Sequence, residues 1–327
     1  MSNTRSDQQG PLQDELAKLD PPLVNVLTAI AAAVAEVAHT LRTASCDETG
    51  TCNTLGDKQL EADIVADSSI FAALRGCGAV ELASSEEKPT DHEMGGSGYS
   101  VAFDPLDGSS IIGANWAVGS IFGVWPGRGF VGRSAREQVA AAYAVYGPKT
   151  LLVLARPVAA GQAPSGAERR HVVQEFVLLP SGAWQLSRAD VRIPQAKKCF
   201  ASANLKATSD NDAYRQLVLH WMSERYTLRY SGGLVPDLHH ILAKARVCGG
   251  GGVFCNPTSP TAPAKLRCLY ECAPLALITE AAGGSSHNGQ GSALDAVLSA
   301  HDQRSPLCLG SADEVAQCLP AMQLHSS

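Results

Sequence analysis

The chain has 327 residues, of which 45% are apolar and 18% charged, an ordinary composition for a folded globular protein with one large core or two joined cores. Its formal net charge of −6, without any run of Lys and Arg, excludes general electrostatic attraction to nucleic acid or to an anionic membrane. The most apolar stretch, residues 29–38, is Ala-rich and too short to span a bilayer, so we expect neither a nucleic-acid nor a membrane partner.

Two helices are predicted in the first quarter of the chain. Asp20 followed by Pro21 is typical of a helix start, because it pairs a capping side chain with a first-turn proline. Apolar residues at helical spacing continue this helix to about Leu41. A second helix is predicted over residues 57–74, with Ile64 on its apolar stripe.

Short apolar runs separated by Pro, Gly and Ser follow, and they continue an alternation of strands and helices. Strands are predicted at 80–84 and 99–103, and further elements at 117–125, 140–146, 150–155 and 175–179. Three helices are predicted later, at 210–224, 236–245 and 273–282. The pattern indicates an α/β fold, with an N-terminal α+β domain over 1–196 and a C-terminal α/β domain over 197–327.

Acidic residues flank the ends of several predicted elements. In the segment that begins at Asp104, a buried strand ends, Pro105 provides a turn, and Asp107 returns towards the same point three residues later. Gly108 and Ser109 would then expose backbone N–H groups, which can bind phosphate. Oxygen ligands without a nearby His or Cys favour magnesium. The acidic residues that we expect to converge are Asp57, Asp63, Glu86, Glu87, Asp104, Asp107 and Glu271.

Simpler interpretations exist for some of these features. Glu86 with Glu87 alone is more often a solvated surface pair, and Asp57 could be a helix cap. Cys268 and Cys272 are spaced as two metal ligands on a helix could be, but the absence of a second pair favours a place in the core.

In four separated blocks the chain resembles the family of fructose-1,6- and sedoheptulose-1,7-bisphosphatases, and its sedoheptulose branch most closely. The resemblance covers residues 53–314. Ile111-Ile112 follow the acidic segment, where fructose bisphosphatases usually have Asn. The other blocks are 121–127, 226–236 and 258–267.

The resemblance implies a layered αβαβα sandwich of the fructose-1,6-bisphosphatase type and a Mg²⁺-dependent hydrolysis of the 1-phosphate of a sugar bisphosphate. Metal ligands for two or three Mg²⁺ ions would be Glu86, Asp104, the Leu106 carbonyl, Asp107 and Glu271. The catalytic residues that orient and deprotonate the attacking water would be Glu87, Asp63 and Asp57. Substrate contacts would come from Gly108, Ser109, Asn204, Tyr230, Lys265, Arg267 and, from a neighbouring subunit of a homodimer or homotetramer, Arg229.

Departures from the family pattern carry further expectations. Cys255-Asn256 stand where fructose bisphosphatases place a Tyr against the far phosphate, which favours a different or longer sugar. Gly98 stands where a Lys of the AMP site is expected, and Pro126-Gly127 replace a basic stretch. We therefore expect no inhibition by AMP.

Ten cysteines lack the paired spacing of a structural zinc site, and most are expected to be small buried hydrophobes. Cys46 and Cys52 lie where plastid members of the family have regulatory cysteines, at a spacing one residue longer. A redox switch and two unpaired thiols are the two alternatives for this pair.

The polar N-terminus predicts a cytoplasmic protein, with a plastid as the alternative if a transit peptide has been removed. The alternative functions are a fructose or dual-specificity bisphosphatase, an inositol-phosphate phosphatase and an inactive sugar-phosphate sensor.

Overall fold

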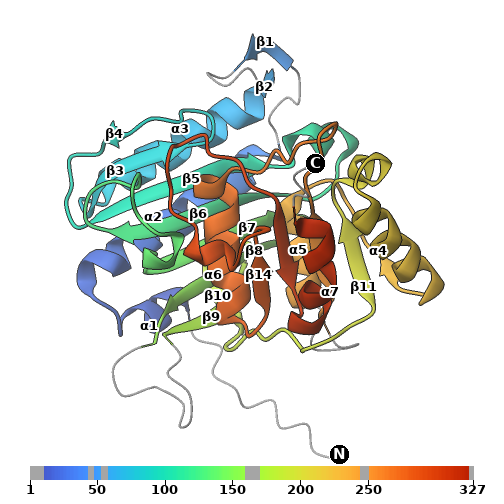
Figure 1. The fold of residues 1–327 in the computed structure, drawn as a ribbon. Coiled ribbons are helices and arrows are strands. Elements are labelled where there is room, and N and C mark those ends of the chain that lie inside the picture. Colours follow the sequence, from blue (N-terminus) through green and yellow to red (C-terminus); the bar gives the residue numbers. More distant parts are fainter. Residues whose placement is uncertain (1–10, 43–47, 53–57, 159–169, 244–249, 324–327) are drawn as a thin grey trace, which may run out of the picture.

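The computed structural model describes residues 11–42, 48–52, 58–158, 170–243 and 250–323. Two sheets and three sets of helices form its layers, which run in Figure 1 from α2 and α3 on the left to α4 on the right. The first layer contains α1 (Leu12–Leu16), α2 (Pro21–Thr40) and α3 (Glu61–Gly76). A short ribbon of β1 (Glu48–Cys52) and β2 (Lys58–Leu60) precedes α3.

The first sheet has eight strands in the order β10-β9-β8-β7-β6-β5-β3-β4. Strands β5 to β10 pair antiparallel with their neighbours in chain order, whereas β3 and β5 are parallel. The strands are β3 (Val80–Ser85), β4 (His92–Glu93), β5 (Tyr99–Asp107), β6 (Val118–Pro126), β7 (Ala140–Tyr146), β8 (Thr150–Pro157), β9 (His171–Leu178) and β10 (Trp184–Arg188).

The second sheet has five strands in the order β12-β11-β13-β15-β14. Its strands are β11 (Cys199–Ser202), β12 (Thr227–Leu228), β13 (Val253–Asn256), β14 (Ser285–His287) and β15 (Leu307–Gly310). Helices α5 (Leu234–Ala243) and α6 (Ala273–Ala281) pack between the two sheets, and α4 (Asp212–Ser223) and α7 (Ala312–Met322) cover the outer face.

Each boundary between layers contains a hydrophobic cluster, and the three clusters account for the order of the layers. One joins α2 and α3 to the first sheet, one joins both sheets through α5 and α6, and one joins the second sheet to α4 and α7. Alternate strand residues face opposite clusters, as the two-residue period of a strand requires. The expected αβαβα sandwich is confirmed.

Helix α2 is long and apolar enough to cross a membrane by length and composition alone. More than half of it is buried, and its apolar face packs in the cluster between the helices and the first sheet. These contacts are those of a core helix, although the helix is longer than the apolar stretch from which the sequence prediction was made.

Several local predictions were wrong. Asp20 precedes α2, but its side chain does not cap the helix and instead accepts a hydrogen bond from the Tyr99 hydroxyl at 3.2 Å. The second helix begins at Glu61 because β2 occupies the residues before it, and Ile64 is 40% exposed. The predicted alternation over 117–179 is a run of four strands without an intervening α-helix in the described residues.

Candidate active site and metal centre

Two of the predicted carboxylates are brought together by the pairing of β3 with β5. These strands are parallel, and Ser85 is the register partner of Phe103. The Glu86 N–H donates to the Phe103 carbonyl at 3.0 Å, which continues the pairing by one residue. Glu86 therefore lies beside Asp104 at the same end of the sheet.

Glu271 joins this pair from a single π-helical turn, η5 (Cys268–Cys272), which leads into α6. The turn is held against β3 by a buried hydrogen bond of 2.8 Å between the Tyr270 hydroxyl and Ser84 Oγ. One carboxylate oxygen each from Glu86, Asp104 and Glu271 lies within 4.8 Å of the others. Such π turns occur often at functional sites, because they displace one side chain from the helical series.

Asp107 lies on β5, the strand that also contains Asp104. The turn that the sequence predicted between these two aspartates is not present. Strand β5 continues to Asp107 with an irregularity between the two aspartates, and the Leu106 N–H donates to Asp104 Oδ1 at 2.9 Å. This bulge, rather than a turn, brings both carboxylates to one end of the strand.

The carboxylate of Asp107 caps α5. It accepts hydrogen bonds from the Leu234 and Val235 N–H groups at 3.1 and 2.6 Å. The helix approaches closely because residue 119, opposite Asp107 in the sheet, is a glycine: a Cβ atom there would lie 2.5 Å from the Val235 side chain. The helix N-terminus favours the charged carboxylate.

Burial and mutual repulsion disfavour negative charge in this group. Burial raises the pKa of Asp104 well above its usual range, and the charges of Glu86, Asp107 and Glu271 raise it further. The pKa of Glu271 is raised in the same way, by burial and then by Glu86. Burial also raises the pKa of Asp107 to about 7, although its two backbone hydrogen bonds oppose the shift.

Asp63 faces the group from the start of α3. It is 3% exposed, and its Oδ2 accepts a hydrogen bond from the Leu60 N–H at 3.0 Å. Burial raises the pKa of Asp63 to about 7, with further contributions from the charges of Glu87 and Glu86, whereas a hydrogen bond from Ser109 lowers it. Glu87 is half-buried, so neither it nor Glu86 is a fully solvated surface residue.

The segment after Asp107 forms a short 3₁₀ helix, η1 (Ser109–Ala114). Gly108 precedes it with a φ of 81°, a left-handed conformation that favours glycine. A Cβ on Gly108 would also lie 3.1 Å from the Cα of Gly233 in the segment before α5. The two predicted phosphate contacts, Gly108 and Ser109, thus lie between the carboxylates and α5.

Arg267 contacts two of the carboxylates. Its side chain is 6% exposed, its guanidinium forms an ion pair with Glu86, and its backbone N–H donates to Glu271 Oε2 at 2.6 Å. The sequence placed Arg267 with the substrate, whereas the structure places it inside the group of predicted metal ligands. A buried arginine partly offsets the negative charge there.

The other predicted substrate residues lie around the second sheet. The Asn204 amide donates to the Pro257 and Ala262 carbonyls at 2.8 and 2.9 Å, which ties η3 (Leu205–Ser209) to the loop after β13. The Tyr230 hydroxyl donates to the Ala203 carbonyl at 3.1 Å. The side chains of Arg229 and Lys265 are exposed.

Three sequence expectations concern residues with no described side chain. Asp57 and Cys46 lie outside the described residues, and Cys52 ends β1 but its side chain is not described. Cys268 and Cys272 are both buried free thiols in the cluster between the sheets, as the core interpretation predicted. Cys255 is fully buried on the α4 and α7 side of β13, so it does not face the carboxylates.

Sequence reasoning did not single out Asp237, in the first turns of α5. Its side chain is buried, and its Oδ1 accepts a hydrogen bond from the Ser231 N–H at 2.7 Å, which fixes the segment that approaches Gly108. Burial raises the pKa of Asp237 to about 6. Its position at the start of the predicted helix 236–245, shortly after a Ser-Gly-Gly segment, was the available signal.

Residues 7–165 match the N-terminal domain of fructose-1,6-bisphosphatase, and residues 193–323 match its C-terminal domain. The chain belongs to the fructose-1,6-bisphosphatase family. The chloroplast sedoheptulose-1,7-bisphosphatase of Chlamydomonas reinhardtii is 46% identical to it over 315 residues, covering 94% of this chain and 77% of the relative. The class 1 fructose-1,6-bisphosphatase of Geobacter sulfurreducens is 34% identical over 304 residues, covering 92% and 91%.

Solved structures of family members have the same fold. A crystal structure provisionally assigned to a sedoheptulose-1,7-bisphosphatase of Toxoplasma gondii superposes with a TM-score of 0.85 at 38% identity, covering 96% of this chain and 98% of the other. Fructose-1,6-bisphosphatase of Leishmania major in its holo form superposes with a TM-score of 0.83 at 28% identity, covering 96% and 99%. The family resemblance deduced from the four sequence blocks is confirmed.

The carboxylates of this family member suit a metal ion of the kind that family enzymes require. All the converging donors are oxygens, Asp104 and Glu271 are buried beside a half-buried Glu86, and their charges repel one another in the absence of a cation. Hard divalent cations prefer oxygen ligands. The residues present therefore fit a divalent cation.

Proposed function

We propose that this chain hydrolyses the 1-phosphate of sedoheptulose 1,7-bisphosphate to give sedoheptulose 7-phosphate and inorganic phosphate. The observation that carries the proposal is the buried, oxygen-only group of Glu86, Asp104 and Glu271. Two relatives that are named chloroplast sedoheptulose-1,7-bisphosphatases support the choice of sugar. They are 46% and 43% identical to this chain over nearly its whole length.

The cofactor in this proposal is magnesium, with two or three ions per site. Glu86, Asp104, Asp107, Glu271 and the carbonyl oxygen of Leu106 would hold it. When bound, magnesium supplies positive charge that polarises the phosphoryl oxygens and stabilises the leaving oxygen. Carboxylates must be deprotonated to bind a cation, so the raised pKa values of Asp104, Asp107 and Glu271 couple metal affinity to pH.

The chain's own residues position the reacting groups. Asp63, with a pKa of about 7, can accept the proton of the attacking water at neutral pH, and Glu87 and Asp57 would orient that water. The water oxygen forms a bond to phosphorus, the bond from phosphorus to the sugar oxygen breaks, and the sugar oxygen gains a proton from solvent. The N–H groups of Gly108 and Ser109 would donate to the phosphoryl oxygens.

The far phosphate and the sugar would contact Asn204, Tyr230 and Lys265 in this chain. Arg229 would reach the far phosphate of a neighbouring subunit in a homodimer or homotetramer, a role that its exposed side chain supports. Light scattering together with the Arg229→Ala variant tests this: an oligomer with a raised KM is expected. A monomer with normal KM would contradict the role.

The decisive experiment compares kcat/KM for sedoheptulose 1,7-bisphosphate and fructose 1,6-bisphosphate in Mg²⁺, with phosphate release as the readout. We expect the seven-carbon substrate to be preferred and EDTA to abolish turnover. Preference for the six-carbon substrate would establish the alternative, a fructose bisphosphatase. No turnover of either substrate, with binding intact, would indicate an inactive sugar-phosphate sensor.

Location and domain division complete the proposal. The chloroplast relatives favour a plastid over the cytoplasm that the sequence alone suggested. The location in a photosynthetic cell of the protein fused to a fluorescent protein tests this point.

The domain boundary is proposed near residue 196. It lies between β10 and β11, which are the last strand of the first sheet and the first strand of the second sheet, and limited proteolysis tests it.

A further inference from the structure

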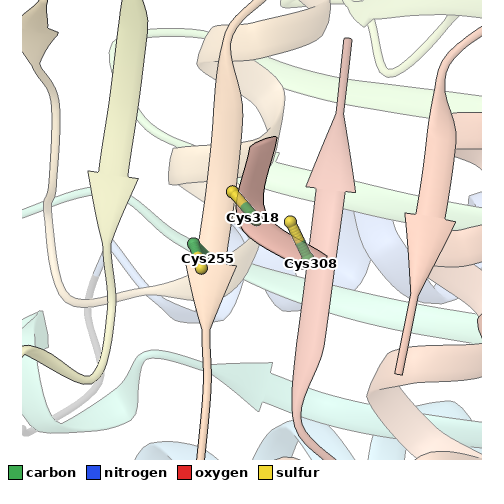
Figure 2. Close-up of side chains that lie close together, drawn as sticks. All are labelled: Cys255, Cys308 and Cys318. Atoms are coloured by element: carbon green, nitrogen blue, oxygen red, sulfur yellow. The ribbon is translucent and has the colours of Figure 1, made fainter. Parts of the chain in front are cut away.

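Three thiols gather in the outer core, away from the carboxylates. Cys255 on β13 and Cys308 on β15 are direct cross-strand partners, and Cys318 reaches them from α7. Figure 2 shows the three side chains close together between the two strands and the helix. Their sulfur atoms all lie within 4.8 Å of one another, and all three residues are completely buried.

A fourth sulfur adjoins the group. Met322 Sδ, one turn further along α7, lies 4.0 Å from Cys255 Sγ. Thiolate and thioether ligands together select soft metal ions such as Cu(I) and Zn²⁺. Tetrahedral zinc with Zn–S bonds of about 2.3 Å places its sulfurs about 3.8 Å apart, so these thiols need to close by about 1 Å at most.

Buried free cysteines are commonly inert small hydrophobes, and a second observation separates this group from that case. The Tyr214 side chain on α4 is completely buried, and its hydroxyl has no hydrogen-bond partner among the described residues. Tyr214 packs in the same buried cluster as Cys255, Cys308, Cys318 and Met322. A buried hydroxyl without an acceptor is costly, and a thiolate formed in this cluster would offer it one after a small shift.

We propose that Cys255, Cys308 and Cys318 form a binding site for a thiophilic ion, Cu(I) or Zn²⁺, with Met322 as the fourth sulfur and Tyr214 as the donor to a thiolate. Binding breaks the S–H bonds of the coordinating thiols, forms metal–sulfur bonds and releases the protons to solvent. A donor in this position orients a ligand and tunes its basicity, as outer partners of metal ligands generally do.

A metal ion at this site would cross-link α7 to the second sheet. Two ligands come from paired strands and two sulfurs from α7, so a bound ion would cross-link β13, β15 and α7, which pack in one apolar cluster. A free metal concentration about 100 times the Kd of the site would shift the folding equilibrium about 100-fold towards the native state.

The test uses the full-length protein, reduced with a phosphine, and two probes. Cd²⁺ reports thiolate coordination by its ultraviolet sulfur-to-metal charge-transfer band, which carboxylate sites do not produce. Cu(I), added against a chromophoric chelator, tests the monovalent ion. We expect one equivalent of thiolate-bound metal per chain, with a higher unfolding temperature and proton release into weak buffer.

Variants identify the ligands. Cys308→Ala and Cys318→Ala should each weaken binding more than about 100-fold, and Tyr214→Phe, which keeps the ring, about 10- to 100-fold. Cys199→Ala is the matched control, because Cys199 is a buried thiol on β11 of the same sheet, outside the group, and it should bind as wild type does.

Some outcomes would overturn the site. Absence of a charge-transfer band in the folded wild type refutes it, as does a band that survives both thiol variants. If a thiol variant does not fold, X-ray absorption of the metal-loaded wild type decides: a first shell of three or four sulfurs supports the site, and a shell of oxygen or nitrogen refutes it.

Discussion

Replacing Asp63 with Asn should stabilise the magnesium-free protein while reducing activity. Burial raises the pKa of Asp63 from 3.8 to about 7, a shift of about 3 units that corresponds to about 4 kcal/mol against the charged form. The folded state holds this proton more tightly than the unfolded state, so stability falls as pH rises from about 4 to 7 and the full penalty applies at pH 8. Asn removes the charge and keeps an oxygen for the Leu60 N–H, at a cost of about 1 to 2 kcal/mol in hydrogen-bond strength.

The expected net gain is therefore about 2 kcal/mol at pH 8, and no gain at pH 4, where wild-type Asp63 is protonated when folded. Urea unfolding in EDTA at the two pH values measures both numbers. Asp212→Asn is the control, since Asp212 has an 85% exposed side chain and its replacement should change stability by less than about 0.5 kcal/mol. In saturating Mg²⁺ the Asp63 variant should lose about 10²- to 10⁴-fold in kcat. A variant less stable than wild type at pH 8 in EDTA would refute the electrostatic reasoning.

Three further predictions follow from the site. Tyr270→Phe leaves the buried Ser84 hydroxyl without its partner, which should cost about 1 to 3 kcal/mol and, by loosening η5, about tenfold in Mg²⁺ affinity, measured by unfolding and by activity against [Mg²⁺]. Asp237→Asn should flatten the fall in stability between pH 4 and 6, because burial raises the pKa of Asp237 to about 6; unchanged slopes would contradict this. AMP at micromolar concentration should leave activity unchanged, since Gly98 and the 126–127 segment lack basic side chains, and inhibition would disprove that inference.

The acidic segment was recognised from a local pattern, whereas the order of the layers was expected from the resemblance to the family. Apolar runs indicated elements at β3 and at β5 to β9 of the first sheet, whereas no strand of the second sheet was predicted. The spacing from Asp104 to Ser109 was the basis for the phosphate site that we propose. The path of the chain between Asp104 and Asp107 was not predictable in this way. A bulge and a turn need the same Pro-containing residues, and only the pairing of β5 with β6 distinguishes them.

Contacts between residues far apart in the chain could not be predicted from local sequence patterns either. Nothing in the sequence around Arg267 indicates that its guanidinium reaches Glu86, 181 residues earlier, instead of solvent. The cluster of three thiols could not be predicted from local sequence either. Cys255, Cys308 and Cys318 have no recognisable ligand spacing, and they meet through a cross-strand pair and a packed helix. Spacing motifs detect sites on one element, whereas both groups here are assembled from three.

The carboxylates remain together although they repel one another, because the backbone holds each of them. Glu86 and Asp104 are fixed by the parallel pairing of β3 and β5, and Glu271 by the π turn before α6. Their backbone cannot move apart without breaking hydrogen bonds of the sheet or the turn, so protons or cations relieve the repulsion. Arg267 supplies one positive charge from within the chain, which leaves the remainder to bound cations. Since protons and cations compete for the same oxygens, the concentration of magnesium needed for activity should fall as pH rises.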